Sequence, residues 1–289
     1  MVGDLFEAMG DERFDLITAN PPFVPSPFNT LRFRDGGRSG EDIQMRVVAG
    51  LPRHLAPGGI AQIITELGER DAEPVANRLR EWIDGAPMDI YIIRLHEYSA
   101  AKYAIGHAQG DDYQTFLDAV QQWGSNLHAQ GYMRVVVTLI SFQWSDPSCG
   151  PPWTRVEEAV SPQRAAGPEI ESEFHAERLA RRTDLPEILR RSWLRRTGPI
   201  ALLDAQLLGG EKRVNTKATL MGQALTIERQ LDPVEREILN HLEKRIAVAE
   251  LLMIFRQLNI EEATVLAGIT SLLRRRLACI DAQVASVIP

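Results

Sequence analysis

The first half of the chain alternates between short apolar segments and amphipathic segments. Four apolar segments are expected to form strands; they are FDLITA (14–19), IAQIITEL (60–67), MDIYIIRLHE (88–97) and MRVVVTLISFQW (133–144). Three segments between them carry apolar residues at helical spacing; they are residues 40–55, 73–85 and 113–131. Strands that alternate with helices of this length predict an α/β fold with a mostly parallel sheet.

The pattern changes near residue 146. Two segments that are rich in turn-forming residues, SDPSCGPPW and SPQRAAGPE, follow the last of these strands. Beyond them, short strands are expected within residues 200–208 and 214–228, and three helices within residues 231–245, 247–258 and 259–276. We therefore expect one domain over residues 1–146, a linker over 147–174, and a small α+β domain with a winged-helix-like arrangement over 175–289.

The composition is that of an ordinary soluble globular protein, with 44% hydrophobic and 25% charged residues among 289. No apolar segment is long enough to span a membrane, and the N-terminal residues do not resemble a signal peptide. The two cysteines, Cys149 and Cys279, lie far apart, which excludes a disulfide framework and a zinc module. We expect a cytoplasmic protein without a metal site.

The net charge of −7 gives the whole molecule no electrostatic attraction for nucleic acids. Arginines are nevertheless frequent between residues 178 and 196 and at 274–276. They are expected to lie on solvated helical faces among acidic residues, with phosphate contacts as the alternative.

The strand expected over residues 14–19 is followed directly by Asn20, Pro21, Pro22 and Phe23, which we call the NPPF segment. Ligands of open parallel sheets bind at the carboxyl ends of the strands, where this segment lies. The prolines fix the backbone shape and leave their carbonyl oxygens free to accept hydrogen bonds. The Asn20 carboxamide adds an acceptor, and Phe23 adds a flat apolar face.

These groups suit a planar NH2 group on a conjugated system, such as an amide or an exocyclic amine. Two acceptors bind both N–H bonds, and the aromatic ring packs against the plane. Catalysis then depends on positioning and electrostatics, and no strong general base is required before attack. The structural alternatives are a turn-capping role for Asn20 and core packing for Phe23.

The NPPF segment resembles the (D/N)PP(Y/F) motif of class I S-adenosylmethionine-dependent methyltransferases that act on planar nitrogen atoms. Residues 34–59, RDGGRSGEDIQMRVVAGLPRHLAPGG, resemble the matching region of the release-factor glutamine methyltransferases and the related methyltransferase small domain enzymes. GDLFEAM (3–9) resembles the family's segment that borders the cofactor adenine. The resemblance is close over residues 1–97 and extends over 98–144 by topology only.

This resemblance implies the C-terminal portion of a Rossmann-like methyltransferase sheet and S-adenosylmethionine as the cofactor. Asn20, Pro21, Pro22 and Phe23 would be the catalytic residues, while Asp4, Leu5 and Asn20 would contact the cofactor. Arg34 and Asp35 would order the loop over the substrate, with a solvated turn as the equal alternative.

The glycine-rich turn and the acidic residue with which this family holds its cofactor are missing. None of the glycine pairs, Gly36-Gly37, Gly58-Gly59 and Gly209-Gly210, lies between an expected strand and helix. The sheet is therefore expected to lack strands and to keep an unpaired edge. We expect the chain to be part of a longer methyltransferase, or to be completed by a partner, and to bind the cofactor poorly alone.

Two classes of function follow. The first is methyl transfer to a planar nitrogen, in a protein glutamine or in an RNA or DNA base. The second is a non-catalytic remnant or a module that binds nucleic acid or protein through its C-terminal helices.

Overall fold

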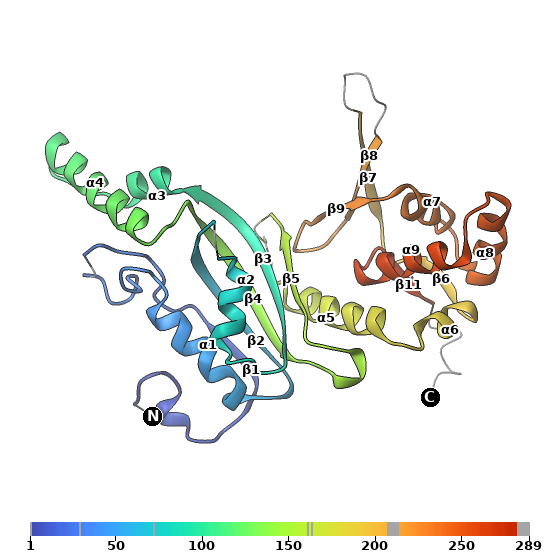
Figure 1. Cartoon of the computed structure of the whole chain (residues 1–289), viewed down its shortest axis with the longest axis horizontal. Helices are drawn as coiled ribbons and strands as arrows, with labels where there is room; N and C mark the ends of the chain where they lie inside the picture. Colours follow the sequence, from blue (N-terminus) through green and yellow to red (C-terminus); the bar gives the residue numbers. More distant parts are fainter. Residues whose placement is uncertain are drawn as a thin grey trace. The chain divides into compact units, whose positions relative to one another are not determined.

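The computed structural model of the chain describes residues 2–28, 30–71, 73–160, 162, 164–206 and 214–281. It divides into two units (Figure 1). Unit 1 comprises residues Met1–Ser145 and Pro151–Glu158, and unit 2 comprises Asp146–Gly150 and Ala159–Pro289.

Unit 1 is built on a mixed sheet whose strand order is β1-β2-β4-β3-β5. The strands are β1 (Phe14–Ala19), β2 (Leu55–Glu69), β3 (Met88–Ser99), β4 (Arg134–Trp144) and β5 (Thr154–Glu158). β1 is parallel to β2, and β3 is parallel to β5, while β4 is antiparallel to both of its neighbours. The expected α/β class is confirmed, but the prediction of a mostly parallel sheet is wrong, because β4 runs antiparallel to both β2 and β3. This mixed sheet is consistent with a Rossmann-like methyltransferase fold.

Helices α1 (Asp42–His54) and α2 (Val75–Trp82) pack on one face of this sheet. Alternate residues of β2 point to this face, so Ala61, Ile63 and Leu67 are buried under the helices. A short helix, η1 (Leu5–Met9), packs against α1, where the rings of Phe6 and His54 stack with their centroids 4.5 Å apart.

Two further helices lie between β3 and β4, and we call residues 100–131 the α3–α4 insertion. They are α3 (Ala100–His107) and α4 (Tyr113–Ala129), which begins with a capping box between Asp112 and Thr115. A second hydrophobic cluster forms beneath them around Tyr103, Trp123, Leu127 and Tyr132. The sequence pattern predicts α4 but not α3.

The outer edge of β1 has no strand partner among the residues that the structure describes. Leu16 of β1 pairs with Ile60 of β2, so the side chains of Leu16 and Ile64 point to the sheet face opposite α1 and α2. These two side chains are 58% and 42% exposed. An apolar strand at an open edge is unfavourable unless another strand covers it.

Residues 147–174, the expected linker, contain regular structure. They hold a short helix η2 (Pro147–Cys149), β5, and the first half of α5 (Gly167–Arg181). β5 is hydrogen-bonded to β3 and so extends the sheet of unit 1.

Unit 2 has α+β structure, as expected. Its helices are α5, α6 (Leu185–Arg190), α7 (Pro233–His241), α8 (Val248–Gln257) and α9 (Glu262–Arg274). Its antiparallel strands form two sheets, β10-β6-β11 and β7-β8-β9. The strands are β6 (Trp193–Arg196), β7 (Ile200–Gln206), β8 (Val214–Leu220), β9 (Glu228–Leu231), β10 (Ile246–Ala247) and β11 (Ala278–Ile280). The core includes Leu239, Leu251, Phe255, Ile269 and Leu272.

The end of one predicted strand, residues 207–208, lies outside the described residues, as does the Gly209-Gly210 pair. Within the described part of the chain, the helices are all too short or too polar to cross a membrane.

Candidate active site

The NPPF segment begins where β1 ends. Asn20 is exposed, Pro21 is buried, and Pro22 and Phe23 are half-buried. The Asn20 carboxamide and the Pro21 carbonyl have no hydrogen-bond partner among the described residues, whereas the N–H groups of Phe23 and Val24 both donate to the carbonyl of Arg34. The two acceptors predicted for a substrate are thus free at the carboxyl edge of the sheet.

Phe23 packs against the cluster beneath the α3–α4 insertion. Part of its ring is therefore used for core packing, which was the structural alternative for this residue. Its half-buried side chain still leaves one portion accessible. Its role in substrate binding stays a prediction.

The chain that follows the NPPF segment folds back against it. Val24 pairs with Asp35 in an isolated parallel bridge. Gly36 and Gly40 make close backbone approaches: a Cβ atom on Gly36 would lie 2.7 Å from the Pro22 oxygen, and one on Gly40 would lie 2.3 Å from the Phe23 oxygen. Only glycine permits such contacts, so these residues set the position of the NPPF backbone.

Asp35 orders this loop from within. Its carboxylate is fully buried and accepts hydrogen bonds from the N–H groups of Thr30 and Leu31, at 2.8 and 2.9 Å, and from Arg34 Nε, at 2.8 Å. Burial opposes ionisation, but these bonds outweigh it and hold the pKa of Asp35 below its ordinary value. Asp35 therefore stays ionised and keeps its hydrogen bonds to the loop, which its predicted role in ordering this loop requires.

The α3–α4 insertion and the short segment between it and β4 hold the same loop from outside. Asn126 Nδ2 donates to the carbonyl oxygens of Pro25 and Arg38, at 3.1 and 2.9 Å. Tyr132 donates to the Ser39 carbonyl at 2.8 Å. These contacts join residues about 90 to 100 positions apart, so local sequence patterns do not reveal them.

A carboxylate that the sequence analysis missed, Glu66, lies near this edge of β2. It shares its sheet face with Leu16 and Thr18 of β1, and its carboxylate accepts a hydrogen bond of 2.5 Å from Tyr103. Tyr103 also packs with Phe23 in one cluster. An acid inside the apolar strand IITEL was the signal available in the sequence.

Burial raises the pKa of the Glu66 carboxyl group, and the hydrogen bond from Tyr103 offsets this only in part. A raised pKa in the folded state means that folding is favoured while Glu66 is protonated and that stability is lost as pH rises through the folded pKa. We expect Glu66→Gln to increase the free energy of unfolding relative to the wild type more at pH 7 than at pH 4. Urea unfolding at both values tests this, with exposed Glu187→Gln as the control. An equal effect of Glu66→Gln at both values would contradict it.

Asp4 and Leu5, the predicted cofactor contacts, are engaged within unit 1. The Asp4 carboxylate forms an exposed ion pair of 2.6 Å with Arg46 of α1. Leu5 is half-buried and packs against the core under α1. Neither residue supplies the donors and backbone approach that a glycine-rich turn provides.

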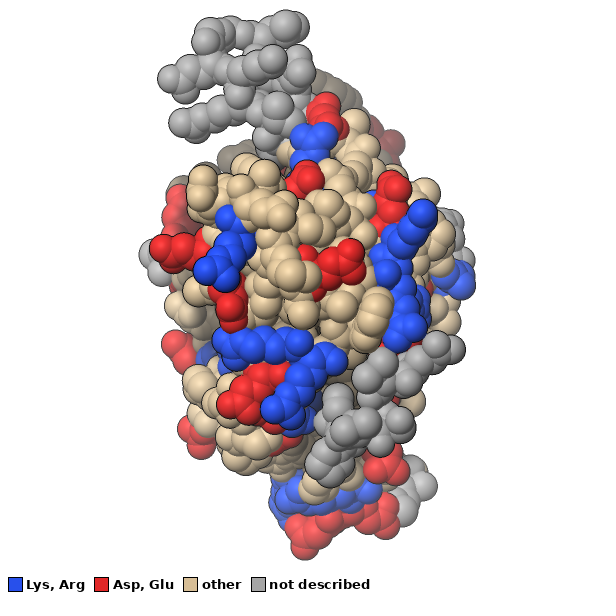
Figure 2. Space-filling model, turned by 90° about the vertical axis from the view of Figure 1, so that its right-hand side faces the viewer, with Lys and Arg blue, Asp and Glu red and all other residues tan. Residues whose placement is uncertain are grey.

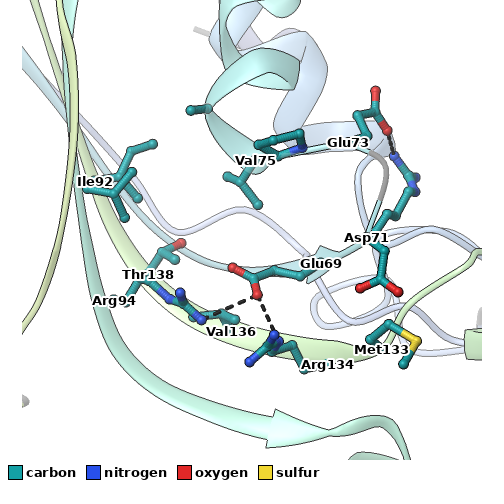
Figure 3. Close-up of a pocket in the computed structure, with 14 residues that line it drawn as sticks. Glu69, Asp71, Glu73, Val75, Ile92, Arg94, Met133, Arg134, Val136 and Thr138 are labelled. Carbon is teal, nitrogen blue, oxygen red and sulfur yellow. Dashed lines mark hydrogen bonds and ion pairs between the residues drawn. The ribbon is translucent and has the colours of Figure 1, made fainter.

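A separate cavity of about 260 Å³ lies at the carboxyl end of β2 beside α2 (Figure 3). The Glu69 carboxylate in its wall binds Arg94 and Arg134, at 3.3 and 3.0 Å, and Glu73 binds Arg70 at 2.5 Å. Because these charges neutralise one another, the cavity shows no strong preference for an ionic ligand. It contains none of the predicted site residues.

Several arginines of unit 2 pair with acids. On the face shown in Figure 2, basic and acidic side chains are interspersed. Ion pairs join Arg182 to Asp184, Arg190 to Glu262, Arg274 to Glu177, Arg275 to Glu235, and Arg276 to Glu173. These arginines lie among acidic residues, which agrees with the expectation from the sequence that they are not arranged to bind phosphates. Within the described residues, no cluster of three or more His, Cys, Asp or Glu side chains is arranged to hold a metal ion.

The mixed α/β sheet, with a proline-rich acceptor segment at the end of its edge strand, is consistent with a Rossmann-like methyltransferase fold. Comparison with known proteins shows a similarity to protein glutamine methyltransferases over part of the chain. No protein-family model matches the chain.

Three relatives illustrate this similarity. A release factor glutamine methyltransferase of Geobacter sulfurreducens is 38% identical over 84 residues, which are 25% of this chain and 29% of the relative. The ribosomal protein uL3 glutamine methyltransferase of Bradyrhizobium diazoefficiens is 37% identical over 97 residues, 28% of this chain and 29% of the relative. A putative protein N5-glutamine methyltransferase of Methanocaldococcus jannaschii is 39% identical over 67 residues, 21% of this chain and 34% of the relative. The chain thus spans about a third or less of these relatives.

Proposed function

We propose that this protein transfers a methyl group from S-adenosylmethionine to a planar nitrogen, namely the side-chain amide of a glutamine in a protein substrate. The observation that carries this proposal is the pair of free acceptors at the end of β1, the Asn20 carboxamide oxygen and the Pro21 carbonyl oxygen. An amide NH2 group has two N–H donors in one plane, and each acceptor binds one of them.

In this arrangement the residues act by orientation. The amide nitrogen is a weak nucleophile because its lone pair is delocalised. Acceptors on both N–H bonds raise its electron density and direct it toward an electrophile. The backbone of the NPPF segment carries both acceptors. It is held in place by the close approach of Gly36 and Gly40 and by hydrogen bonds to the Arg34 carbonyl.

The cofactor supplies the methyl group on a sulfonium sulfur. The described residues do not fit it by themselves, because Asp4 and Leu5 are engaged elsewhere and no glycine-rich turn separates a strand from a helix. We propose that a further polypeptide segment pairs with the open edge of β1 and supplies the rest of the cofactor site. Leu16, which is exposed on this strand, supports such a cover.

We expect titration of S-adenosylmethionine into this chain to give no measurable binding heat, because the described residues do not form a pocket that encloses the cofactor. Isothermal titration calorimetry with S-adenosylhomocysteine as a second ligand tests this. Micromolar binding of either compound would contradict it and would mean that this chain completes the pocket by another route.

The named activities of the relatives favour a protein glutamine over a nucleic-acid base.

In unit 2, the order α7, β10, α8, α9, β11 follows that of a winged-helix domain, and β6 supplies the central strand of its sheet. We propose that this domain is winged-helix-like and helps to bind the substrate in the cytoplasm.

The second candidate function is that of a binding module without catalytic activity, and the incomplete cofactor site favours it. Labelled methyl transfer by the protein in its natural length separates the two.

A further inference from the structure

The loop of residues 30–38 projects apolar side chains into solvent directly beside the NPPF segment. Phe33 is 80% exposed and Leu31 is 38% exposed. Arg34 follows Phe33 in the chain, and its carbonyl oxygen accepts hydrogen bonds from the N–H groups of Phe23 and Val24, at 3.1 and 3.0 Å. The loop is therefore hydrogen-bonded to the NPPF segment at Phe23, three residues beyond Asn20.

The loop is ordered even though its tip is exposed. The buried Asp35 carboxylate holds the N–H groups of Thr30 and Leu31 inside the tip. Asn126 holds the carbonyl of Arg38 at the other end. A preorganised loop loses little conformational entropy when a partner binds, so its exposed side chains contribute more to affinity.

The charge of the loop differs from that of the whole chain. Arg32 and Arg38 are exposed, and among the described residues no carboxylate lies within ion-pairing distance of either guanidinium. The acid of the loop, Asp35, is buried and occupied by its own hydrogen bonds. The loop therefore carries two exposed positive charges beside apolar side chains, on a chain whose net charge is −7. One exposed acid, Asp42, borders it at Gly37 and accepts a hydrogen bond from the Ser39 hydroxyl.

We propose that the 30–38 loop is the docking surface for a segment of the methyl-accepting protein in which apolar side chains stand next to aspartate or glutamate. The proposal rests on the proposed function in taking the acceptor to be a protein. Phe33 and Leu31 supply the apolar contact, and Arg32 and Arg38 bind the carboxylates. Aromatic and arginine side chains are the residue types that most often dominate binding energy at interfaces.

Two fluorescent 12-residue peptides test this proposal. Both contain leucine and phenylalanine and lack glutamine; one carries glutamates at four positions, and the other carries lysines there. With the full chain and no cofactor, fluorescence anisotropy should show the glutamate peptide binding at least about tenfold more tightly than the lysine peptide. Its affinity should fall as salt increases.

Four variants locate the site. Phe33→Ala and Arg32→Glu should each weaken binding of the glutamate peptide at least about fivefold. The matched controls are Tyr113→Ala, another exposed aromatic of unit 1, and Arg256→Glu, an exposed arginine of unit 2, and both should leave the affinity unchanged. The side chains of Phe33 and Arg32 point into solvent, so their loss leaves the fold intact.

Equal binding of the two peptides, or an unchanged affinity in Phe33→Ala and Arg32→Glu, would overturn the proposal. The peptides lack a methyl acceptor, so this result is independent of catalysis. Failure of methyl transfer with intact peptide binding would instead count against the proposed function alone.

Discussion

Replacing Asn20 by alanine should reduce methyl transfer by the protein with a completed cofactor site at least about 100-fold, a loss of the size that removal of one oriented hydrogen-bonding group causes. The carboxamide oxygen is one of two acceptors for the target NH2 group, and without it the nitrogen is held at one N–H only. The fold should be unaffected, because the Asn20 side chain is exposed and has no hydrogen-bond partner among the described residues. The initial rate of labelled methyl transfer to a glutamine-containing protein measures the effect.

Two companion variants make this result specific. Asn20→Asp keeps an acceptor oxygen in place and should retain more activity than Asn20→Ala. Asn77→Ala removes an exposed carboxamide from α2 and should have no effect. Transfer at the original rate in Asn20→Ala, with unfolding unchanged, would show that the NPPF segment is not the reacting site.

The sheet and its two covering helices were predictable because their side chains repeat with the period of the element. β2 alternates between a face under α1 and α2 and the opposite face, and α1 places Val47, Val48 and Leu51 on one side. Periodicity records burial, so it identifies those elements whose two faces meet different surroundings.

Elements that depend on tertiary contacts were not predictable. α3 has a weak amphipathic pattern and is held by the packing of Tyr103 and His107 against Trp123. β5 is short, charged and surrounded by turn-forming residues, and it is a strand because β3 offers it an open edge. Residues 56–59, APGG, have a turn-forming composition but lie inside β2, where the pairing with β1 shifts register between Phe14 and Leu16.

The residues of the candidate site also fall into those that the sequence could reveal and those that only the folded chain brings together. The NPPF segment was identified from its own residues and from its resemblance to a family motif, whereas the close backbone approaches of Gly36 and Gly40 to it are visible only in the structure. Asn126 and Tyr132 hold that loop from about 90 to 100 residues away, and only the folded chain brings them there. Glu66 was visible as an acid in an apolar strand, but its partner Tyr103 was not.

The second large effect concerns the loop that carries these contacts. Gly40→Ala should detach the loop from the NPPF segment, because Gly40 has a left-handed backbone (φ +77°) and an added Cβ atom would lie 2.3 Å from the Phe23 oxygen. The left-handed conformation alone costs alanine about 1–2 kcal/mol. The clash with a backbone atom adds to this cost, since no flexible side chain can move aside.

Gly58→Ala is the matched control for the backbone strain. Gly58 also has a left-handed backbone, with φ +81°, but a Cβ atom there would meet nothing within 4 Å. Both variants should lower the free energy of unfolding, and Gly40→Ala should lower it more. Trypsin should cleave after Arg32 or Arg38 much faster in Gly40→Ala than in Gly58→Ala, because only the former releases the loop. Equal cleavage rates and equal unfolding free energies would mean that contact between the loop and Phe23 does not hold the NPPF segment in place.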